Sequence, residues 1–198
     1  NSYNLPFDRR AIRNLIGTSV RSFQGRVPKA GAKYLFVIEE VPSKKIFGAS
    51  LIIAKQGTPQ SPHIYLERGL ERKRNRALKK SITREYFQFG ATKNGPTEIG
   101  GLILKRRFRS RREKFGKQLS WVRFLYMARH PERFEKRVLA EFLPPLEKGK
   151  GSLFWDAVGR PATGLSYRQA EWLSVTTKEF VFSLFPKGKL YTEFLPKK

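Results

Sequence analysis

The spacing of apolar residues along 98–129 changes once, from a continuous apolar run to helical spacing, and this change limits the folds that the chain can adopt. The run Ile99–Leu104 is short and apolar, which is typical of a buried strand. A loop dense in Arg and Lys follows and ends at Gly116. From Lys117 onward, apolar residues recur at helical spacing. The sequence therefore predicts a strand, a basic loop and a helix, in that order.

This order of elements suits the binding of phosphate groups. The first amide groups of a helix lack intrahelical partners, and the helix dipole adds partial positive charge at the same end. A basic loop is also common as a solvated surface turn, so these residues alone leave both interpretations open.

The chain carries a strong positive charge. Its 41 Lys and Arg residues exceed its 16 Asp and Glu residues by 25, and its isoelectric point is near 10.7. Residues 67–80 hold seven basic and two acidic residues, and residues 105–117 hold eight basic residues and one acidic residue. Such a field attracts nucleic acid, an anionic membrane surface or a phosphate-bearing cofactor, and charge does not decide among them.

Cysteine is absent from the sequence, which excludes a disulfide framework, a thiolate zinc site and a cysteine nucleophile. The two histidines, His63 and His130, are too few for a histidine-based metal centre and are expected at the surface, so no metal site is predicted. No apolar run reaches the length of a membrane span, and the N-terminus does not resemble a signal peptide. A cytoplasmic protein without a membrane span is expected. Three tryptophans are expected in the core, namely Trp121, Trp155 and Trp172.

The hydrophobic pattern predicts strands mainly in the first half of the chain and helices mainly in its last third. An amphipathic helix is expected over 8–23, with an inner face formed by Ile12, Leu15, Ile16, Val20 and Phe23. Strands are expected over 34–39 and 46–55 as a hairpin, and then over 64–66, 82–89, 137–143 and 191–195. Helices are expected over 152–158, 166–173 and 177–184. The predicted fold class is α+β, close to α/β, with a mixed sheet flanked by helices in a single domain over 1–198. Residues 144–198 are the candidate for a helical C-terminal extension of that domain.

A series of short motifs resembles the arginine N-succinyltransferase family. The block Phe154–Arg160 (FWDAVGR) resembles the FW-x-x-x-GR block of that family, and Phe180–Lys187 resembles its FIAELMPKH block. The other matching blocks are FQGRVP at 23–28, YLFVIE at 34–39, RF with MA at 123–128, VLAE at 138–141 and LY at 190–191. These blocks keep the family's order over nearly the whole chain, so the chain resembles a member of this family.

The resemblance implies a GNAT-like acyltransferase fold and the transfer of a succinyl group from succinyl-CoA to the α-amine of arginine. GNAT-type enzymes hold the CoA pyrophosphate on a loop that enters a helix, which favours the phosphate-binding interpretation of the basic loop. The implied acyl-CoA contacts are Leu102 and Leu104 on the strand, with Arg109, Arg111, Arg112, Lys114, Phe115 and Gly116 in the loop and at the start of the helix. Lys114 stands where the family has a loop glycine, and its ammonium group is expected to compensate as a point charge.

Direct acylation of an amine needs a base, donors for the carbonyl oxygen and a proton for the leaving thiolate. Glu98 and Glu141 are the candidates for the base or for binding a cationic substrate, arginine or another amine, and Glu141 is the candidate catalytic residue of the two. Ordinary ion pairing is the alternative for both. Tyr126 is the candidate proton donor, and a role as a core aromatic residue is its alternative.

The family pattern includes segments that have no counterpart in this sequence. These are an N-terminal strand and helix, and a C-terminal segment with a histidine assigned as proton donor. Four residues also depart from the family's pattern, namely Pro161, Ala162, Thr163 and Ser183. The chain is therefore expected to be an incomplete or diverged acyltransferase with weak activity by itself. Two other functions stay open, namely a non-catalytic nucleic-acid-binding protein and a subunit that forms a homo- or hetero-oligomer with a related chain.

Overall fold

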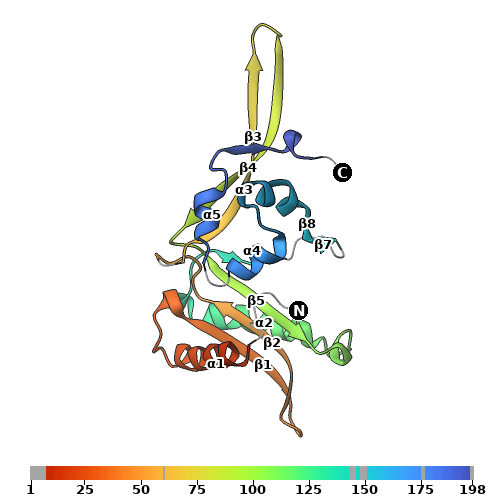
Figure 1. The fold of residues 1–198 in the computed structure, drawn as a ribbon. Helices are drawn as coiled ribbons and strands as arrows, with labels where there is room; N and C mark the ends of the chain where they lie inside the picture. Colours follow the sequence, from red (N-terminus) through yellow and green to blue (C-terminus); the bar gives the residue numbers. More distant parts are fainter. Residues whose placement is uncertain (1–7, 60, 143–145, 148–150, 175–176, 197–198) are drawn as a thin grey trace. The chain divides into compact units, whose positions relative to one another are not determined.

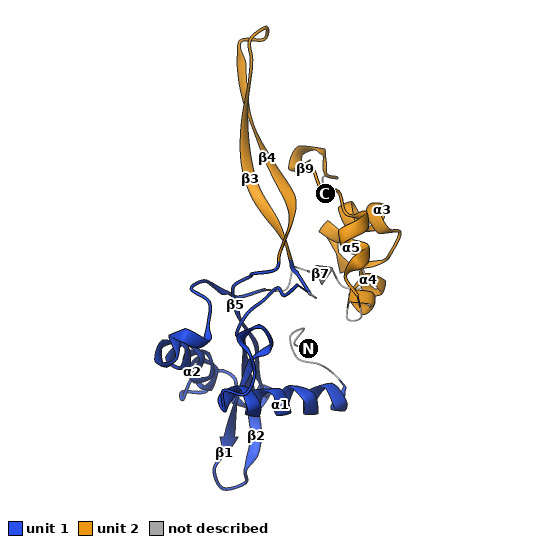
Figure 2. Ribbon diagram, turned by 90° about the vertical axis from the view of Figure 1, so that its left-hand side faces the viewer, with its two compact units in different colours: residues 1–63, 93–141 blue, residues 64–92, 142–198 orange. Residues whose placement is uncertain are grey.

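The structure is a computed structural model that describes residues 8–59, 61–142, 146–147, 151–174 and 177–196 (Figure 1). The chain divides into two compact units, which Figure 2 shows in different colours. Unit 1 comprises residues 1–63 and 93–141, and unit 2 comprises residues 64–92 and 142–198. The segment 144–198 therefore shares a unit with residues 64–92.

Unit 1 is built around a four-stranded mixed sheet. Its strands, in spatial order, are β1 (Lys33–Glu40), β2 (Lys45–Ile53), β5 (Thr97–Leu104) and β6 (Val138–Leu139). The pairs β1–β2 and β2–β5 are antiparallel, and β5–β6 is parallel. The predicted hairpin and the predicted mixed sheet are confirmed. Of the strand predicted over 137–143, the described residues form only the two-residue β6, and residue 143 lies outside the described residues.

The first helix, α1 (Arg9–Phe23), lies along the outer edge of β1 and supplies hydrogen-bond acceptors to it. Asp8 caps the helix, since its Oδ2 accepts a hydrogen bond from the Ala11 amide at 2.8 Å. The Lys33 amide donates to Ser22 Oγ at 3.1 Å, and the Leu35 amide donates to Ser19 Oγ at 2.9 Å. These bonds satisfy two edge amides of β1 that have no strand neighbour on that side.

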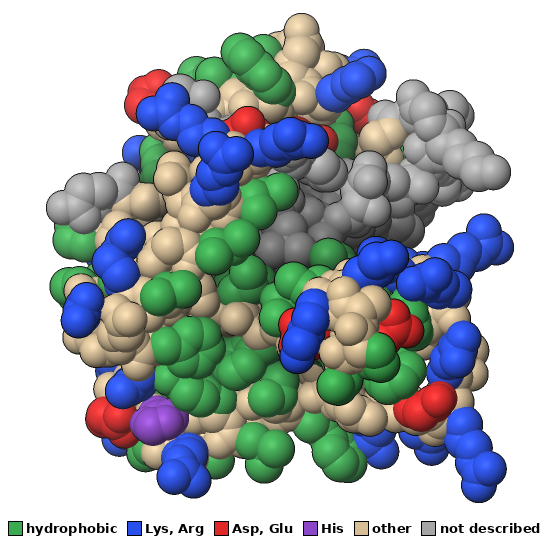
Figure 3. Space-filling view, turned by 90° about the horizontal axis from the view of Figure 1, so that it is seen from below, with side chains coloured by type: hydrophobic (Ala, Val, Ile, Leu, Met, Phe, Trp, Pro, Cys, Tyr) green, Lys and Arg blue, Asp and Glu red, His purple; other side chains and the backbone are tan. Residues whose placement is uncertain are grey.

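The inner face of α1 differs from the prediction. Its buried residues are Leu15, Ser19 and Ser22, whereas Ile16 and Val20 are half-exposed. The helix is turned so that its serines reach the strand edge, and hydrophobic periodicity does not indicate such a role. Apolar side chains are therefore exposed in unit 1, and on the face drawn in Figure 3 hydrophobic side chains gather between Lys and Arg side chains.

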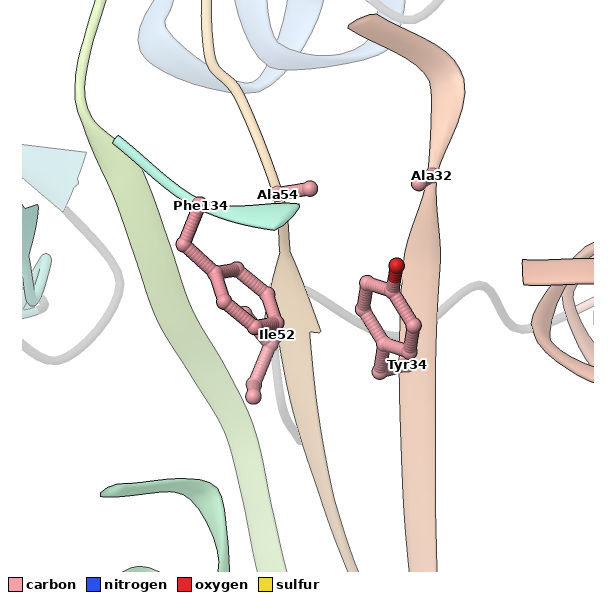
Figure 4. Packing of buried hydrophobic residues seen from close by; sticks show 5 residues of the cluster. All are labelled: Ala32, Tyr34, Ile52, Ala54 and Phe134. Atoms are coloured by element: carbon pink, nitrogen blue, oxygen red, sulfur yellow. The ribbon is translucent and has the colours of Figure 1, made fainter. Parts of the chain in front are cut away.

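The second long helix, α2 (Phe115–Arg129), packs on one face of the sheet. Ser50 Oγ donates to the Leu119 carbonyl at 2.8 Å, and both residues are buried. A cluster of buried residues, which Figure 4 labels, forms the core of this unit: Ala32, Tyr34, Ile52, Ala54 and Phe134. Tyr126 and Met127 of α2 pack against it. The predicted order of strand, basic loop and helix is confirmed, because Gly116 is the second residue of α2 and no regular helix includes residues 109–114.

Unit 2 contains a long hairpin and several short helices. Three strands pair in the order β3-β4-β9, namely β3 (His63–Asn75), β4 (Lys80–Thr92) and β9 (Lys189–Tyr191). The first residue of β3, His63, still belongs to unit 1, and the rest of the strand belongs to unit 2. A second pair joins β7 (Leu146–Glu147) and β8 (Gly151–Ser152). The helical segments are a π-helical turn Trp155–Gly159, α3 (Arg160–Thr163), α4 (Tyr167–Ser174) and α5 (Glu179–Leu184). The helices predicted in this region are confirmed. The strand predicted over 191–195 is wrong except at Tyr191, because a 3-10 turn spans Thr192–Phe194.

The three tryptophans have different environments. Trp155 is half-buried, lies 5.7 Å from the Phe185 ring and donates from Nε1 to the Leu165 carbonyl at 2.8 Å. Trp121 and Trp172 are 57% and 76% exposed, so the prediction that they belong to the core is wrong. α2 is apolar on two sides, and only one of them faces the sheet. Lys117 Nζ lies 4.3 Å from the centroid of the outward-facing Trp121 ring.

Gly48 in β2 makes the contact between α2 and the sheet possible, so we expect G48A to destabilise the protein. A Cβ at this position would lie 2.7 Å from Leu119 Cδ1, 2.8 Å from Leu104 Cδ1 and 2.9 Å from Ile38 Cγ2. Such overpacking costs about 1–3 kcal/mol, which urea denaturation would measure. The control is G17A in α1, where the added Cβ would lie 3.6 Å from Arg21 Nη1, an ordinary contact, and alanine favours the helix. Equal effects of the two substitutions would contradict the tight packing at Gly48.

Glu71 in β3 gives unit 2 a pH-dependent component of stability. Tyr191 Oη donates to Glu71 Oε2 at 2.5 Å and Lys189 Nζ donates to Oε1 at 3.0 Å, and these bonds lower the Glu71 pKa from 4.5 to about 2. Because the folded pKa is the lower one, this stabilisation is present above pH 4.5 and is lost as the pH falls toward 2. Denaturation of wild type and E71Q between pH 5 and pH 2 would show a weaker pH dependence in the variant. E67Q, which removes a carboxylate of the same strand outside these hydrogen bonds, should keep the wild-type pH dependence.

Candidate functional site

A β-bulge in β5 shapes the edge of the sheet beside the basic loop. Leu51 of β2 lies opposite Gly100, but Ala49 lies opposite Ile103. Two residues, Gly101 and Leu102, therefore face the single residue Ser50. Gly101 has a φ of +56°, a conformation that glycine adopts without strain.

The bulge sets the direction of the backbone groups that follow it. The Lys105 amide donates to the Phe47 carbonyl at 2.8 Å, and Ile103 pairs with Ala49, so these two residues face β2. Leu102 and Leu104 alternate with them and direct their amides and carbonyls to the opposite edge. Within the described residues, β6 pairs with β5 only at Thr97 and Glu98, so this edge has no strand partner beside Leu102 and Leu104. Among the expected acyl-CoA contacts, these two leucines thus present backbone groups at an open edge.

An aromatic anchor holds the basic loop against the sheet. The Phe108 ring stacks on the Phe47 ring of β2, with centroids 4.1 Å apart and planes 22° apart. Phe115, the first residue of α2, lies edge-on to Phe47 at 5.1 Å. Phe47 and Phe108 are buried. The two ends of the loop are therefore fixed by packing, although its charged side chains are exposed.

The arginine side chains of the loop differ in the number of hydrogen bonds that they make to the protein. Arg109 Nε donates to the Leu104 carbonyl at 2.9 Å, and Arg111 Nε donates to the Arg107 carbonyl at 3.2 Å. Both side chains keep their terminal nitrogens for other partners. Arg112 and Lys114 are exposed, and the described residues include no partner for either side chain.

The N-terminus of α2 is open to a ligand. Lys114 precedes the helix with φ +52° and ψ 44°, and its side chain makes no capping hydrogen bond. This left-handed conformation suits the glycine expected at this position, and a lysine adopts it at a cost of about 1–2 kcal/mol. The amides of Lys117 and Gln118 bond to the Lys114 carbonyl, whereas within the described residues the Phe115 and Gly116 amides have no backbone acceptor. A Cβ on Gly116 would have no atom within 4 Å, so an anion can approach these amides closely.

The two candidate carboxylates lie near the end of the sheet where β5 begins. Glu98 is 3% exposed and accepts a hydrogen bond from Gln56 Nε2. Glu98 pairs with Leu139 in the parallel ladder, and Glu141 follows two residues after Leu139. Glu141 is half-exposed, and its Oε1 lies 3.9 Å from His63 Nε2.

The surface position expected for His63 is wrong, since its side chain is only 12% exposed. The residue begins strand β3 rather than lying in a loop. Sequence reasoning also missed Gln56, which lies in a segment rich in glycine and proline and carries no pattern that indicates a site.

Tyr126 lies in an aromatic cluster on the sheet-facing side of α2. Its ring packs against five others, those of Phe23, Tyr34, Phe36, His130 and Phe134. Arg133 Nη1 donates to Tyr126 Oη at 2.8 Å. Burial raises the Tyr126 pKa, and the nearby guanidinium opposes part of that rise. The Tyr126 hydroxyl therefore keeps its proton at neutral pH, and the Arg133 guanidinium is positioned to stabilise the phenolate when the proton is lost.

The described residues contain no group of three or more His, Asp or Glu residues that could hold a metal ion. No helix among them is both long enough and apolar enough to span a membrane.

Comparison with known proteins assigns this chain to a family. The model of the arginine N-succinyltransferase beta subunit family matches residues 2–198. The chain belongs to the arginine N-succinyltransferase beta subunit family. The resemblance drawn from the short motifs is therefore confirmed.

Named relatives agree with this family. The arginine N-succinyltransferase of Yersinia pestis (strain Pestoides F) is 30% identical over 195 residues, which cover 97% of this chain and 54% of that protein. The arginine N-succinyltransferase of Photorhabdus laumondii is 27% identical over 186 residues, which cover 93% of this chain and 53% of that protein. A chain from the structure of arginine/ornithine succinyltransferase subunit AI from Pseudomonas aeruginosa matches with a TM-score of 0.80 and 28% identity, over 98% of this chain and 56% of that one.

These matches confirm the α+β fold class with its mixed sheet and flanking helices. This member of the arginine N-succinyltransferase beta subunit family spans about half the length of the curated relatives it matches. None of the three relatives described above is named for nucleic-acid binding.

We expect F108A to release the basic loop from the sheet, because it removes the ring that stacks on Phe47. Trypsin cleaves after Lys and Arg, so cleavage between Lys105 and Lys114 reports the opening of this loop directly. Cleavage should become about tenfold faster for each 1.4 kcal/mol of lost local stability. F108L, which keeps an apolar side chain, should show a smaller increase. If the sites at Arg9 and Arg10 in α1 became equally sensitive, Phe108 would support the whole unit rather than the loop.

Proposed function

We propose that this chain binds succinyl-CoA and contributes to the transfer of its succinyl group to the α-amine of L-arginine. The observation that carries the proposal is the open N-terminus of α2, where Gly116 leaves space beside two amides that have no backbone acceptor among the described residues. Membership of the arginine N-succinyltransferase beta subunit family and the names of the relatives support the same reaction.

The residues around this helix end fit the groups of a CoA thioester. The Phe115 and Gly116 amides would hold the pyrophosphate, and Arg111, Arg112 and Lys114 would neutralise its charge. The open edge offers the Leu104 amide and the Leu102 carbonyl to the amide groups of the pantetheine arm, as an added strand would. The Leu102 amide would also donate to the thioester carbonyl, whose oxygen gains negative charge during acyl transfer.

The carboxylates at the start of β5 are proposed to receive the cationic acceptor. Glu98 and Glu141 carry the charge that arginine requires in a protein with a net charge of +25. Gln56 orients the buried Glu98, and His63 faces Glu141. Glu141 is the more accessible of the two carboxylates and is proposed to take the proton from the substrate ammonium, which makes the amine nucleophilic.

We keep Tyr126 as the proposed donor of the proton to the leaving thiolate. Burial raises the Tyr126 pKa, so the hydroxyl is protonated at neutral pH and holds a proton to give. Arg133 would stabilise the phenolate that remains after donation, through the same hydrogen bond that it makes to Tyr126 Oη. The phenolate would then regain a proton from the substrate nitrogen, which loses its second proton as the amide forms.

The proposal includes an assembly. The matched family is described as a beta subunit, and the solved relative is described as a subunit of arginine/ornithine succinyltransferase. We therefore propose that this chain works in the cytoplasm in an oligomer with a further chain, which is either identical or related.

Titration calorimetry with CoA and succinyl-CoA tests the cofactor part of the proposal. We expect the double variant R111A/R112A to bind both ligands more weakly, since each charge-assisted hydrogen bond contributes about 1.5–3 kcal/mol when formed. The control is the double variant R9A/R10A in the first turn of α1, which removes the same charge from exposed positions and should bind as wild type does. Equal affinity in both double variants, or no binding to wild type, would contradict the assignment.

A thiol-release assay with succinyl-CoA and L-arginine tests the reaction. Release that depends on arginine supports catalysis by this chain. CoA binding without release would support the CoA site and contradict catalysis by this chain in isolation.

A further inference from the structure

Arg123 carries a positive charge into the interior of unit 1. It lies on the side of α2 that faces the sheet and is only 4% exposed. Burial lowers its pKa, because desolvation disfavours the charged form. A side chain of this kind is almost always paired with an opposite charge, since an uncompensated buried charge is costly.

Among the residues that the structure describes, Arg123 has only uncharged partners. Its Nη1 donates to the Gly100 carbonyl at 3.3 Å, its Nε donates to the Ser120 carbonyl at 3.3 Å, and its Nη2 donates to Ser120 Oγ at 3.0 Å. Within the described part of the chain, no carboxylate forms an ion pair with it, and burial is the only cause of its pKa shift. Three of the five N–H donors are used, so one donor remains on each terminal nitrogen. That pair of donors matches the two oxygens of a carboxylate.

The place of Arg123 indicates which part of a ligand it meets. Gly100 directly precedes the bulge at Gly101 and Leu102, where the backbone turns to the open edge of β5. Arg123 lies seven residues beyond Gly116, which is about 10 Å along the helix axis. A thioester with its phosphates at the start of α2 and its arm along the open edge of β5 would bring its acyl group toward this guanidinium.

We propose that Arg123 binds the distal carboxylate of a dicarboxylic acyl group and so selects succinyl-CoA over thioesters of monocarboxylic acids. The selection rests on the proposed function, because it requires that CoA binds at α2. An acyl carboxylate supplies the negative charge that the described residues do not place beside Arg123. The phosphates of CoA are the other source of negative charge on the same ligand, and the choice of probes separates the two.

Calorimetric titration of the full chain with CoA, acetyl-CoA and succinyl-CoA provides the test. Wild type should bind succinyl-CoA more tightly than acetyl-CoA. In R123Q the affinity for succinyl-CoA should fall by about 10- to 100-fold, while the affinities for CoA and acetyl-CoA stay the same. R123K should keep part of the preference, because it retains the charge but loses the paired donors. R129Q, at an exposed position in the last turn of α2, removes the same charge from the same helix and should leave all three affinities unchanged.

Several results would overturn this proposal. Equal losses for all three ligands in R123Q would show that Arg123 holds the bulge or a phosphate instead of the acyl group. Equal affinities of wild type for the three ligands would refute the selection without any variant, even if R123Q failed to fold. No binding of CoA to wild type would overturn the proposed function together with this inference. CoA binding without discrimination would overturn the inference alone.

Discussion

One extra residue in β5 determines which backbone groups of unit 1 are available to a ligand. Gly101 and Leu102 face Ser50 together, and this bulge shifts the register of every residue that follows. Without the shift, Leu102 would direct its amide and carbonyl to β2, and the neighbouring residues Gly101 and Ile103 would face the open edge instead. The bulge also exposes the Gly100 carbonyl to Arg123, so that the strand and α2 are joined at the same point.

The sequence was sufficient for features that depend on neighbouring residues. The change of hydrophobic period between Ile99 and Tyr126 predicted a strand, a loop and a helix, because side chains repeat at two residues in a strand and near 3.6 in a helix. The helix expected over 8–23 begins at its predicted N-terminal residue, because the Asp8 carboxylate bonds to the first-turn amide of Ala11. The loop and strand residues that are expected to contact acyl-CoA lie together in the structure because they are close in the chain.

Features that depend on distant residues were not predictable in this way. Ser19 and Ser22 are buried because a strand edge needs acceptors, and a helical wheel assigns serine to the solvent side. Trp121 is exposed because α2 has two apolar sides and the sheet covers only one. The pairing of His63 with Glu141 and of Gln56 with Glu98 joins residues 78 and 42 positions apart, and no spacing in the sequence indicates either pair.

The two serines of α1 also affect how this sheet interacts with other chains. An extended peptide that approached β1 from outside would find the amides of Lys33 and Leu35 already bonded. Strand addition, the first step of domain exchange and of fibril growth, is therefore disfavoured on that side. On the other side, no described strand pairs with β5 beside Leu102 and Leu104, so that edge stays open. The two edges of the sheet therefore differ: the edge of β1 is closed to strand addition by another copy of the chain, whereas the edge of β5 is free to bind a ligand.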